Sequence, residues 1–179
     1  DGEAGFGYTL IEDNALPPLG FGDDELEALV LGLREVQAVA DPALAEAAKT
    51  ALTKLRARLP ARQAHRLTHA VLAAKRFEKP PKPGIDARQL RQAAWDEMTI
   101  SFDYVDANGA ATQRQVDPLS ITYMQSSHCL LAYCHLRQDF RAFRLDRMRA
   151  LVVSDHSFRP RRVPMLRDYL ARLRDDTWA

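Results

Sequence analysis

The chain has 179 residues, of which 46% are hydrophobic and 27% are charged, and its formal net charge is +1. This is an ordinary globular composition, long enough for one domain with a substantial core or for two small domains. The near-zero net charge excludes a nucleic-acid binder that is basic overall, so any basic surface must be local. Between Arg137 and Arg162 there are eight arginines, no lysine and three acidic residues, so positive charge is concentrated in the last third.

The cysteines and the hydropathy pattern bear on the cellular compartment. Cys129 and Cys134 lie five residues apart, and on a strand such residues point to opposite faces, so they cannot form a disulfide with each other. We therefore expect free thiols in a reducing compartment. No stretch approaches the roughly 20 apolar residues of a membrane span, and no signal-peptide pattern opens the sequence. The prediction is a cytoplasmic protein without a membrane partner.

The first half of the chain predicts helices after a short glycine-rich strand. Glycines at positions 2, 5 and 7 precede Tyr-Thr-Leu-Ile, a pattern typical of a turn that enters a strand, and Pro17-Pro18 ends it. A helix capped by Asp23 or Asp24 follows, then a second helix capped by Asp41 with Pro42 in its first turn. A weaker helical pattern covers 62–76. The apolar stripes of the first two helices comprise Leu26, Leu29, Val30, Leu33 and Val36, then Leu44, Ala47, Ala48, Ala51, Leu52 and Leu55.

The second half changes from helical to strand periodicity. Three prolines stiffen a linker that precedes Asp86, and Asp86 is expected to cap a short helix ending near Trp95. Apolar residues then alternate with polar ones over 98–104, which predicts a half-buried strand, and Asn108-Gly109 predicts a hairpin. We expect Pro118 to interrupt the return strand. Further strands are predicted over 119–124, 128–137 and 149–154, before a last helix with Leu166, Tyr169, Leu170 and Leu173 facing inward.

The stretch 128–147 is the most informative part of the sequence. Four of its arginines alternate with phenylalanine and leucine, which a purely solvated surface would not require. The positions of Arg137, Arg141 and Arg144 also fit a basic amphipathic helix by spacing alone. Two interpretations remain open for these side chains. Either they bind something anionic, or they form surface ion pairs with Asp139 and Asp146.

This stretch resembles the WYL domain, the effector-sensing module of a group of bacterial transcription regulators. The resemblance covers roughly 98–160 and is strongest in Ala132-Tyr-Cys-His-Leu-Arg and in Asp139-Phe-Arg-Ala-Phe-Arg-Leu-Asp-Arg. The Trp-Tyr-Leu triplet that names the family falls on His128, Cys129 and Leu130, so only the leucine is shared. Residues 5–10, Gly-Phe-Gly-Tyr-Thr-Leu, are similar to the wing of the winged helix-turn-helix domain that precedes this sensor.

The resemblance implies an α+β fold: an N-terminal helical segment, a small and strongly bent antiparallel β-barrel of the Sm/SH3-like type, and a C-terminal helix. It also favours strand, turn and strand over a helix for 137–147. Most of the N-terminal DNA-binding domain would be absent. The implied divisions are 1–16, a remnant of the wing; 17–78, a helical linker or dimerisation segment; 79–85, a proline-rich linker; 86–160, the WYL-like barrel; and 161–179, the C-terminal helix.

The resemblance further implies the sensing and dimerisation part of a regulator that acts on DNA. A nucleotide or a short single-stranded nucleic acid would bind an arginine-rich surface, since guanidinium groups donate bidentately to phosphate. In the barrel, Arg144 and Arg147 can instead bind the turn at Asp146. An alternative function is a structural homodimerisation module with no ligand. The candidate ligand-binding residues are Tyr104, Arg114, His128, Arg137, Arg141, Arg144 and Arg147.

Metal and catalytic sites are not expected. His128, Cys129, Cys134 and His135 have suitable side chains for zinc, but strand residues six apart lie about 20 Å apart, far beyond the span of one metal site. A nucleophile on a sharp glycine-flanked turn is absent from the sequence, and so is a carboxylate placed by spacing to orient a histidine. We expect no metal, no cofactor and no enzymatic activity.

Overall fold

The computed structural model describes residues 20–70, 72, 80–124 and 126–177, and this part is an α+β protein with five helices and one five-stranded antiparallel sheet. The expected wing at 1–16 lies outside the described residues. The helices are α1 (Asp23–Val39), α2 (Pro42–Arg58), α3 (Ala61–Thr68), α4 (Ala87–Asp96) and α5 (Arg162–Thr177). The strands are β1 (Met98–Val105), β2 (Ala111–Tyr123), β3 (His128–Cys134), β4 (Asp139–Arg144) and β5 (Met148–Ser157), with a 3-10 turn, η1 (Leu145–Arg147), before β5.

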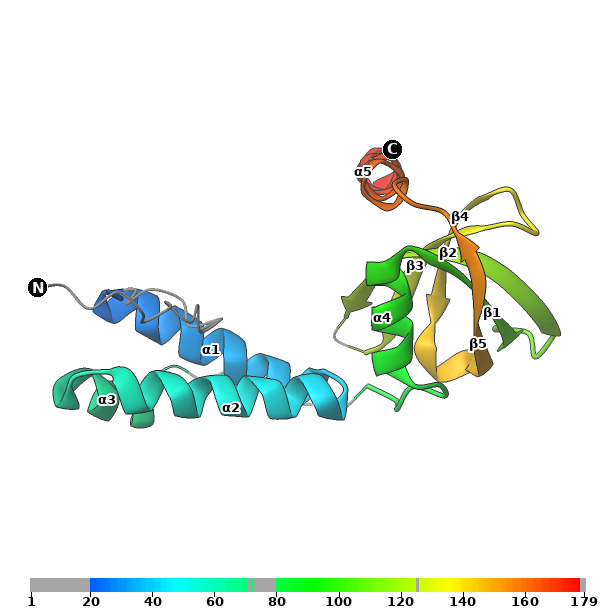
Figure 1. Ribbon diagram of the computed structural model, residues 1–179. Coiled ribbons are helices and arrows are strands. Elements are labelled where there is room, and N and C mark those ends of the chain that lie inside the picture. Colours follow the sequence, from blue (N-terminus) through cyan, green and yellow to red (C-terminus); the bar gives the residue numbers. More distant parts are fainter. Residues whose placement is uncertain (1–19, 71, 73–79, 125, 178–179) are drawn as a thin grey trace, which may run out of the picture.

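Helices α1, α2 and α3 form an arm that projects from the sheet, with the α1–α2 corner nearest to it (Figure 1). The start of α2 is as predicted, because the Asp41 carboxylate accepts hydrogen bonds from the N–H groups of Ala43 and Leu44, both at 3.1 Å. The start of α1 differs from the prediction. Its N-cap is Gly22, whose N–H donates to the Glu25 carboxylate at 2.7 Å.

Strand β2 corrects the expectation that Pro118 divides two strands. It runs continuously through the proline and changes partner there: its first half pairs with β1 as far as Val116, and its second half pairs with β3 from Val116 onward. Pro118 therefore lies just past the end of the β1 ladder, where its missing N–H removes no bond to β1. A register shift between Pro118 and Ser120 marks the same point. The strand predicted over 149–154 corresponds to β5, which is longer and covers Met148–Ser157.

The sheet has the order β4-β3-β2-β1-β5 and is strongly curled. Phe102 on β1 and Phe143 on β4 have ring centroids 5.3 Å apart, whereas three strand spacings in a flat sheet would separate them by about 14 Å. The sheet is nevertheless open, because within the described residues β4 pairs only with β3, and β5 only with β1. A closed barrel of the Sm/SH3-like type is not confirmed.

Two other predictions for this sheet are confirmed. A hairpin joins β1 and β2, with Gly109 at φ 82° in its turn. The stretch after β3 is turn and strand rather than helix, with Gln138 at φ 52° in the turn before β4. The resemblance therefore described this stretch better than its helical spacing did.

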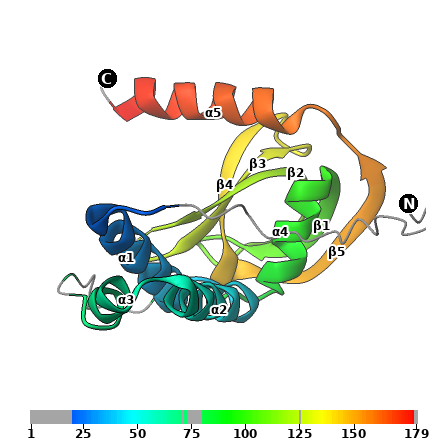
Figure 2. The same cartoon turned by 60° about the vertical axis from the view of Figure 1, so that its left-hand side comes forward.

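The two faces of the sheet contribute to separate cores. Helix α4 covers the inner face, where Leu90 packs against Phe102 and Leu130. Helix α5 covers part of the outer face, where Tyr169 packs with Leu119, Leu131 and Phe158. Leu170 and Leu173 were predicted to face inward, but they are 43% and 39% exposed. The reason is visible in Figure 2, where α5 runs past the edge of the sheet.

Candidate functional site

The edge strand β4 and the turn before it carry two exposed arginines. Arg137 lies in the β3–β4 turn and Arg141 lies on β4 opposite Ala132. Within the described residues neither guanidinium forms an ion pair with a carboxylate, so the surface-pair interpretation does not account for them. A planar, permanently charged donor without an acidic partner is available to an anionic ligand.

Arg144 has a different role from these two. It faces Cys129 in the β3–β4 ladder, and its Nε and Nη2 donate to the two carboxylate oxygens of Asp146, each at 3.0 Å. Burial acts to raise the pKa of Asp146, but the hydrogen bonds and charge of Arg144, together with the charge of Arg147, outweigh it and the pKa is lowered. Arg144 therefore fixes the turn after β4. This agrees with the alternative in which Arg144 binds the turn at Asp146.

Tyr104 and Arg114 lie on other strands of the sheet. The Tyr104 ring packs edge to face against Phe102 and Phe143, with centroids 6.3 and 5.2 Å away, and its hydroxyl accepts a 3.4 Å hydrogen bond from the N–H of Arg144. Arg114, on β2, lies opposite Phe102 of β1, and its Nε donates to the Thr112 hydroxyl at 3.1 Å. Strand β3 separates Arg114 from β4, so the sheet does not bring all the candidate arginines onto one strand.

Helix α5 adds two residues beside β4 that the sequence analysis missed. The Tyr169 ring stacks on Phe140 with centroids 5.0 Å apart, and the Arg172 guanidinium also lies over Phe140, at 4.9 Å. Arg172 donates to Asp139 at 3.0 Å and remains 62% exposed. Burial raises the pKa of Tyr169, and the charge of Arg141 opposes that rise, which places Arg141 within electrostatic range of the helix.

We call Arg137, Arg141 and Arg172, together with the Phe140 and Tyr169 rings beside Arg172, the basic edge. Arg137 lies in the turn before β4, Arg141 on β4 and Arg172 on α5. The pairing of β4 with β3 puts Arg141 on the same side of the sheet as Ala132, and Phe140 on the other side. Guanidiniums that come from three elements suit several phosphates of a chain better than a single phosphate.

His128 is separated from the basic edge. It is 7% exposed, and its ring packs edge to face against Tyr123 with centroids 4.8 Å apart. It lines a cleft between the helical arm and the sheet. The residue at the position of the family's tryptophan therefore does not contribute to the same surface as the arginines.

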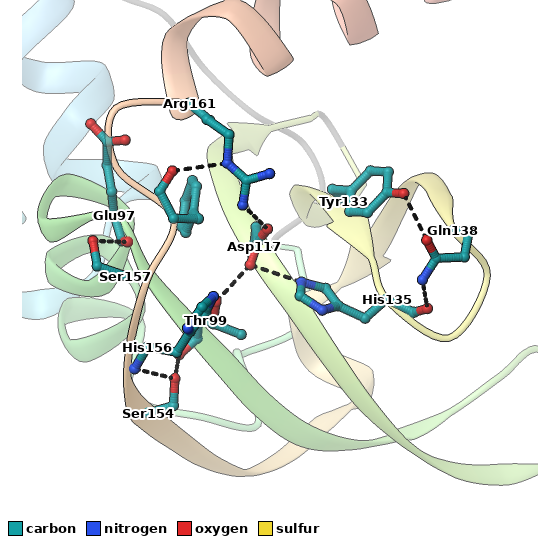
Figure 3. Close-up of polar contacts among 11 residues, drawn as sticks. Glu97, Thr99, Asp117, Tyr133, His135, Gln138, Ser154, His156, Ser157 and Arg161 are labelled. Carbon is teal, nitrogen blue, oxygen red and sulfur yellow. Dashed lines mark hydrogen bonds and ion pairs between the residues drawn. The ribbon is translucent and has the colours of Figure 1, made fainter.

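A buried polar cluster on the outer face is centred on Asp117 (Figure 3). Asp117 is 2% exposed; its Oδ1 accepts from the Thr99 hydroxyl at 2.7 Å and lies 2.9 Å from His135 Nε2. Its Oδ2 lies 4.0 Å from the Arg161 guanidinium. No carboxylate was predicted by spacing to orient a histidine, yet the fold places Asp117 beside His135.

In the described part of the chain no serine or cysteine side chain is hydrogen-bonded to this Asp–His pair, and the Thr99 hydroxyl donates to Asp117 instead of to His135. The Ser154 hydroxyl donates to the Thr99 carbonyl at 2.8 Å instead of approaching His135. Cys134 is fully buried on the inner face, and Cys129 is a second buried free thiol on the outer face. The cluster therefore joins β1, β2 and the start of α5, and it has the character of a structural polar network.

Two further properties concern only the described residues. They contain no group of three His, Cys, Asp or Glu side chains that could hold a metal ion. Each of their helices is too short or too polar to span a bilayer.

Comparison with known proteins identifies a domain family over the part of the chain from α4 to β5. Residues 87–153 match the WYL domain. This match confirms, over these residues, the predicted resemblance to WYL-domain transcription regulators. The WYL match begins at the first residue of α4 and ends within β5, so it contains the curled sheet except the end of β5. It also contains the part of the basic edge that lies on β4 and in the turn before it.

One relative is the HTH-type transcriptional regulator YobV of Bacillus subtilis (strain 168), which is 29% identical over 161 residues. The alignment covers 87% of this chain and 50% of YobV, so the chain spans about half the length of that curated relative. Among solved structures, the chain is similar to proteasome accessory factor B/C (PafBC) of Arthrobacter aurescens, with 21% identity and a TM-score of 0.38, covering 80% of this chain and 22% of that one.

Proposed function

We propose that this chain is the ligand-sensing and dimerisation portion of a transcription regulator, and that its basic edge binds a short single-stranded nucleic acid or a nucleotide. The observation that supports this most is the pair of exposed arginines, Arg137 and Arg141, without acidic partners in the described residues. Arg172 lies beside them on α5 and presents a guanidinium that is 62% exposed. Bidentate hydrogen bonds from such groups suit phosphate oxygens.

The rings of the basic edge act as supports in this proposal. Tyr169 stacks on Phe140 and Arg172 also lies over that ring, and Phe143 is only 4% exposed. Bases would therefore stack on the planar guanidinium of Arg172 instead of on phenylalanine. Because the arginines come from three separate elements, a short strand with several phosphates is a better fit than a mononucleotide.

The proposal extends to the parts of a regulator around this domain. YobV is named as an HTH-type transcriptional regulator, and we propose that this chain likewise modulates DNA binding by a winged helix-turn-helix domain on its N-terminal side. Residues 17–78 would connect that domain to the sensor and contribute to a homodimer in the cytoplasm. The curled sheet would be of the Sm/SH3-like type. Tyr104, Arg114, Arg144 and Arg147 would then shape the site from within the sheet.

Fluorescence anisotropy of a labelled 12-nucleotide single-stranded DNA tests the basic edge. Arg141→Ala should weaken binding by about 1–3 kcal/mol, since it removes a charged phosphate contact. Arg58→Ala is a matched control, because Arg58 is exposed on α2 in the arm. Binding of the wild type should also weaken with salt, with a log–log slope of about −2 to −3. Equal affinities for the two variants would contradict the proposal.

A second candidate function is a structural homodimerisation module without a ligand. It is favoured by the exposed apolar side chains of α5, where Val163 is 53% exposed and Leu170 is 43% exposed. Sedimentation velocity of the wild type and of Leu170→Glu distinguishes the two functions. A dimer that Leu170→Glu dissociates, together with no DNA binding at low salt, would favour the structural module.

A further inference from the structure

A cleft of about 610 Å³ lies between the helical arm and the sheet. Its walls are the α1–α2 corner, the proline-rich linker, the first residues of α4, and a ring pair formed by Tyr123 and His128. Small-molecule sites commonly have volumes of about 300–1,000 Å³ and lie where two structural units meet. This cleft is therefore of a size and position that suit a small ligand.

The walls are held in place by bonds between the arm, the linker and the sheet. Arg91 on α4 donates to both carboxylate oxygens of Asp41 at 3.2 and 3.1 Å, and only 4% of the Asp41 side chain is exposed. The N–H of Gly84 donates to the Leu145 carbonyl at 2.9 Å, and a Cβ at Gly84 would lie 2.3 Å from the Met148 carbonyl oxygen. The cleft is thus formed before any ligand arrives, which lowers the cost of binding.

Most of the lining is apolar and rigid. The side chains of Val39, Pro80, Pro83 and Ile85 contribute to it, and the Tyr123–His128 pair offers ring edges. Proline and aromatic side chains lose little conformational freedom when a ligand covers them. A flat apolar body, such as an aromatic ring system, matches these walls.

The charge that remains for a ligand is positive. Asp41 is occupied by Arg91 and by the start of α2, and Asp86 accepts from the N–H groups of Arg88 and Gln89 at 2.8 and 3.2 Å. The exposed side chains of Lys82 and Arg88 line the same cleft, and neither has an acidic partner within the described part of the chain. An anionic group on the ligand would complement them.

We propose that this cleft binds a small organic anion: an aromatic ring system that carries one acidic group. The rings lie between the linker prolines and Tyr123, and the acidic group binds Lys82 and Arg88. The site is separate from the basic edge and does not depend on nucleic-acid binding. Because the ligand contacts both the arm and the sheet, its binding stabilises one placement of the arm relative to the sensor.

The test uses 8-anilinonaphthalene-1-sulfonate as the probe, because it combines apolar rings with one negative charge and fluoresces when buried. We expect saturable binding of one molecule per chain. Ala43→Phe and Ala38→Phe fill the cleft from α2 and α1, and each should weaken binding by about tenfold or more. Both residues line the cleft and have exposed side chains, and far-UV circular dichroism verifies that both variants are folded.

Charge variants and a neutral probe separate this site from general hydrophobic binding. Lys82→Glu should weaken sulfonate binding by about fivefold to tenfold, whereas Lys54→Glu, an equal charge change at an exposed site on α2, should not. The neutral analogue N-phenyl-1-naphthylamine should respond to Ala43→Phe but not to Lys82→Glu. The proposal is wrong if the wild type does not bind the sulfonate, if both filled and folded variants bind it as well as the wild type, or if Lys54→Glu weakens binding as much as Lys82→Glu.

Discussion

The inner and outer faces of the curled sheet use the same strands for different purposes. On the inner face Phe102 is 1% exposed and Leu130 is 0% exposed, in a core with no buried charge among its clustered residues. On the outer face an equally buried position is a carboxylate, Asp117. Because side chains alternate along a strand, a single sheet can hold an apolar core on one side and a buried polar network on the other. Arg141 belongs to neither, because it pairs with Ala132 of the inner face but is exposed at the edge of the sheet.

The largest expected loss of stability is for a substitution on the inner face. Phe102→Ala removes a ring that packs against Tyr104 and Phe143, and it should lower the free energy of unfolding by about 3–5 kcal/mol through lost burial and a cavity. Urea denaturation measures this. Phe140→Ala, at a half-buried position on the outer side, is the comparison, and its cost should be clearly smaller. Equal losses would mean that the two faces do not differ as described.

A somewhat smaller loss of stability is expected on substitution of the buried carboxylate Asp117. Asp117→Ala leaves the Thr99 hydroxyl and the His135 ring without their acceptor, and it should cost about 2–4 kcal/mol. Asp117→Asn keeps one oxygen acceptor, so it should cost less. Denaturant titrations of both variants test the prediction, and a loss below about 0.5 kcal/mol for Asp117→Ala would show that the cluster does not join the strands.

The pH dependence of stability should reveal the Arg144–Asp146 pair. The folded-state pKa of Asp146 is lowered, so its contribution is present above the unfolded pKa and is lost as the pH falls through the folded pKa. With partly exposed partners, the contribution should stay under about 1 kcal/mol. Asp146→Asn should therefore be less stable than the wild type at pH 6, and the gap should close near pH 2.5. A stability difference that persists at low pH would show that it arises from packing instead of from charge.

The smallest effect on stability is expected at the basic edge. Arg141 is exposed and has no acidic partner in the described residues, so Arg141→Ala should change the free energy of unfolding by less than about 0.5 kcal/mol. The same variant should weaken DNA binding. Thermal denaturation alongside the anisotropy titration checks both. A large loss of stability would show that Arg141 is a structural residue like Arg144.

Local sequence signals were sufficient to predict the helices and the hairpin that depend on residues close together in the sequence. The starts of α2 and α4 followed from caps such as Asp41, and the β1–β2 hairpin followed from Asn108-Gly109. Apolar spacing predicted α1 as well, although its cap is Gly22 instead of Asp23 or Asp24. Pro118 was misinterpreted because the effect of a proline in a strand depends on which neighbour is paired there. Leu170 and Leu173 were misplaced because helical spacing does not reveal how far a helix overlaps a sheet.

The candidate site was only partly accessible from sequence. The exposed arginines were visible by composition, but their division into the free Arg141 and the paired Arg144 depends on strand register. Arg172 contacts Asp139 from 33 residues away, and His135 contacts Asp117 from 18 residues away. No local pattern links such pairs, so the support of the basic edge by α5 and the Asp117 cluster required the folded structure.

The most direct test of the account is to locate bound DNA on the protein by NMR. Amide chemical-shift changes would be followed while a 12-nucleotide single-stranded DNA is titrated into the ¹⁵N-labelled chain. We predict that the largest changes fall on Arg137, on β4 and around Arg172, with little change in α2. Changes confined to α1–α3, or no changes at low salt, would contradict the claim that the basic edge is the effector site.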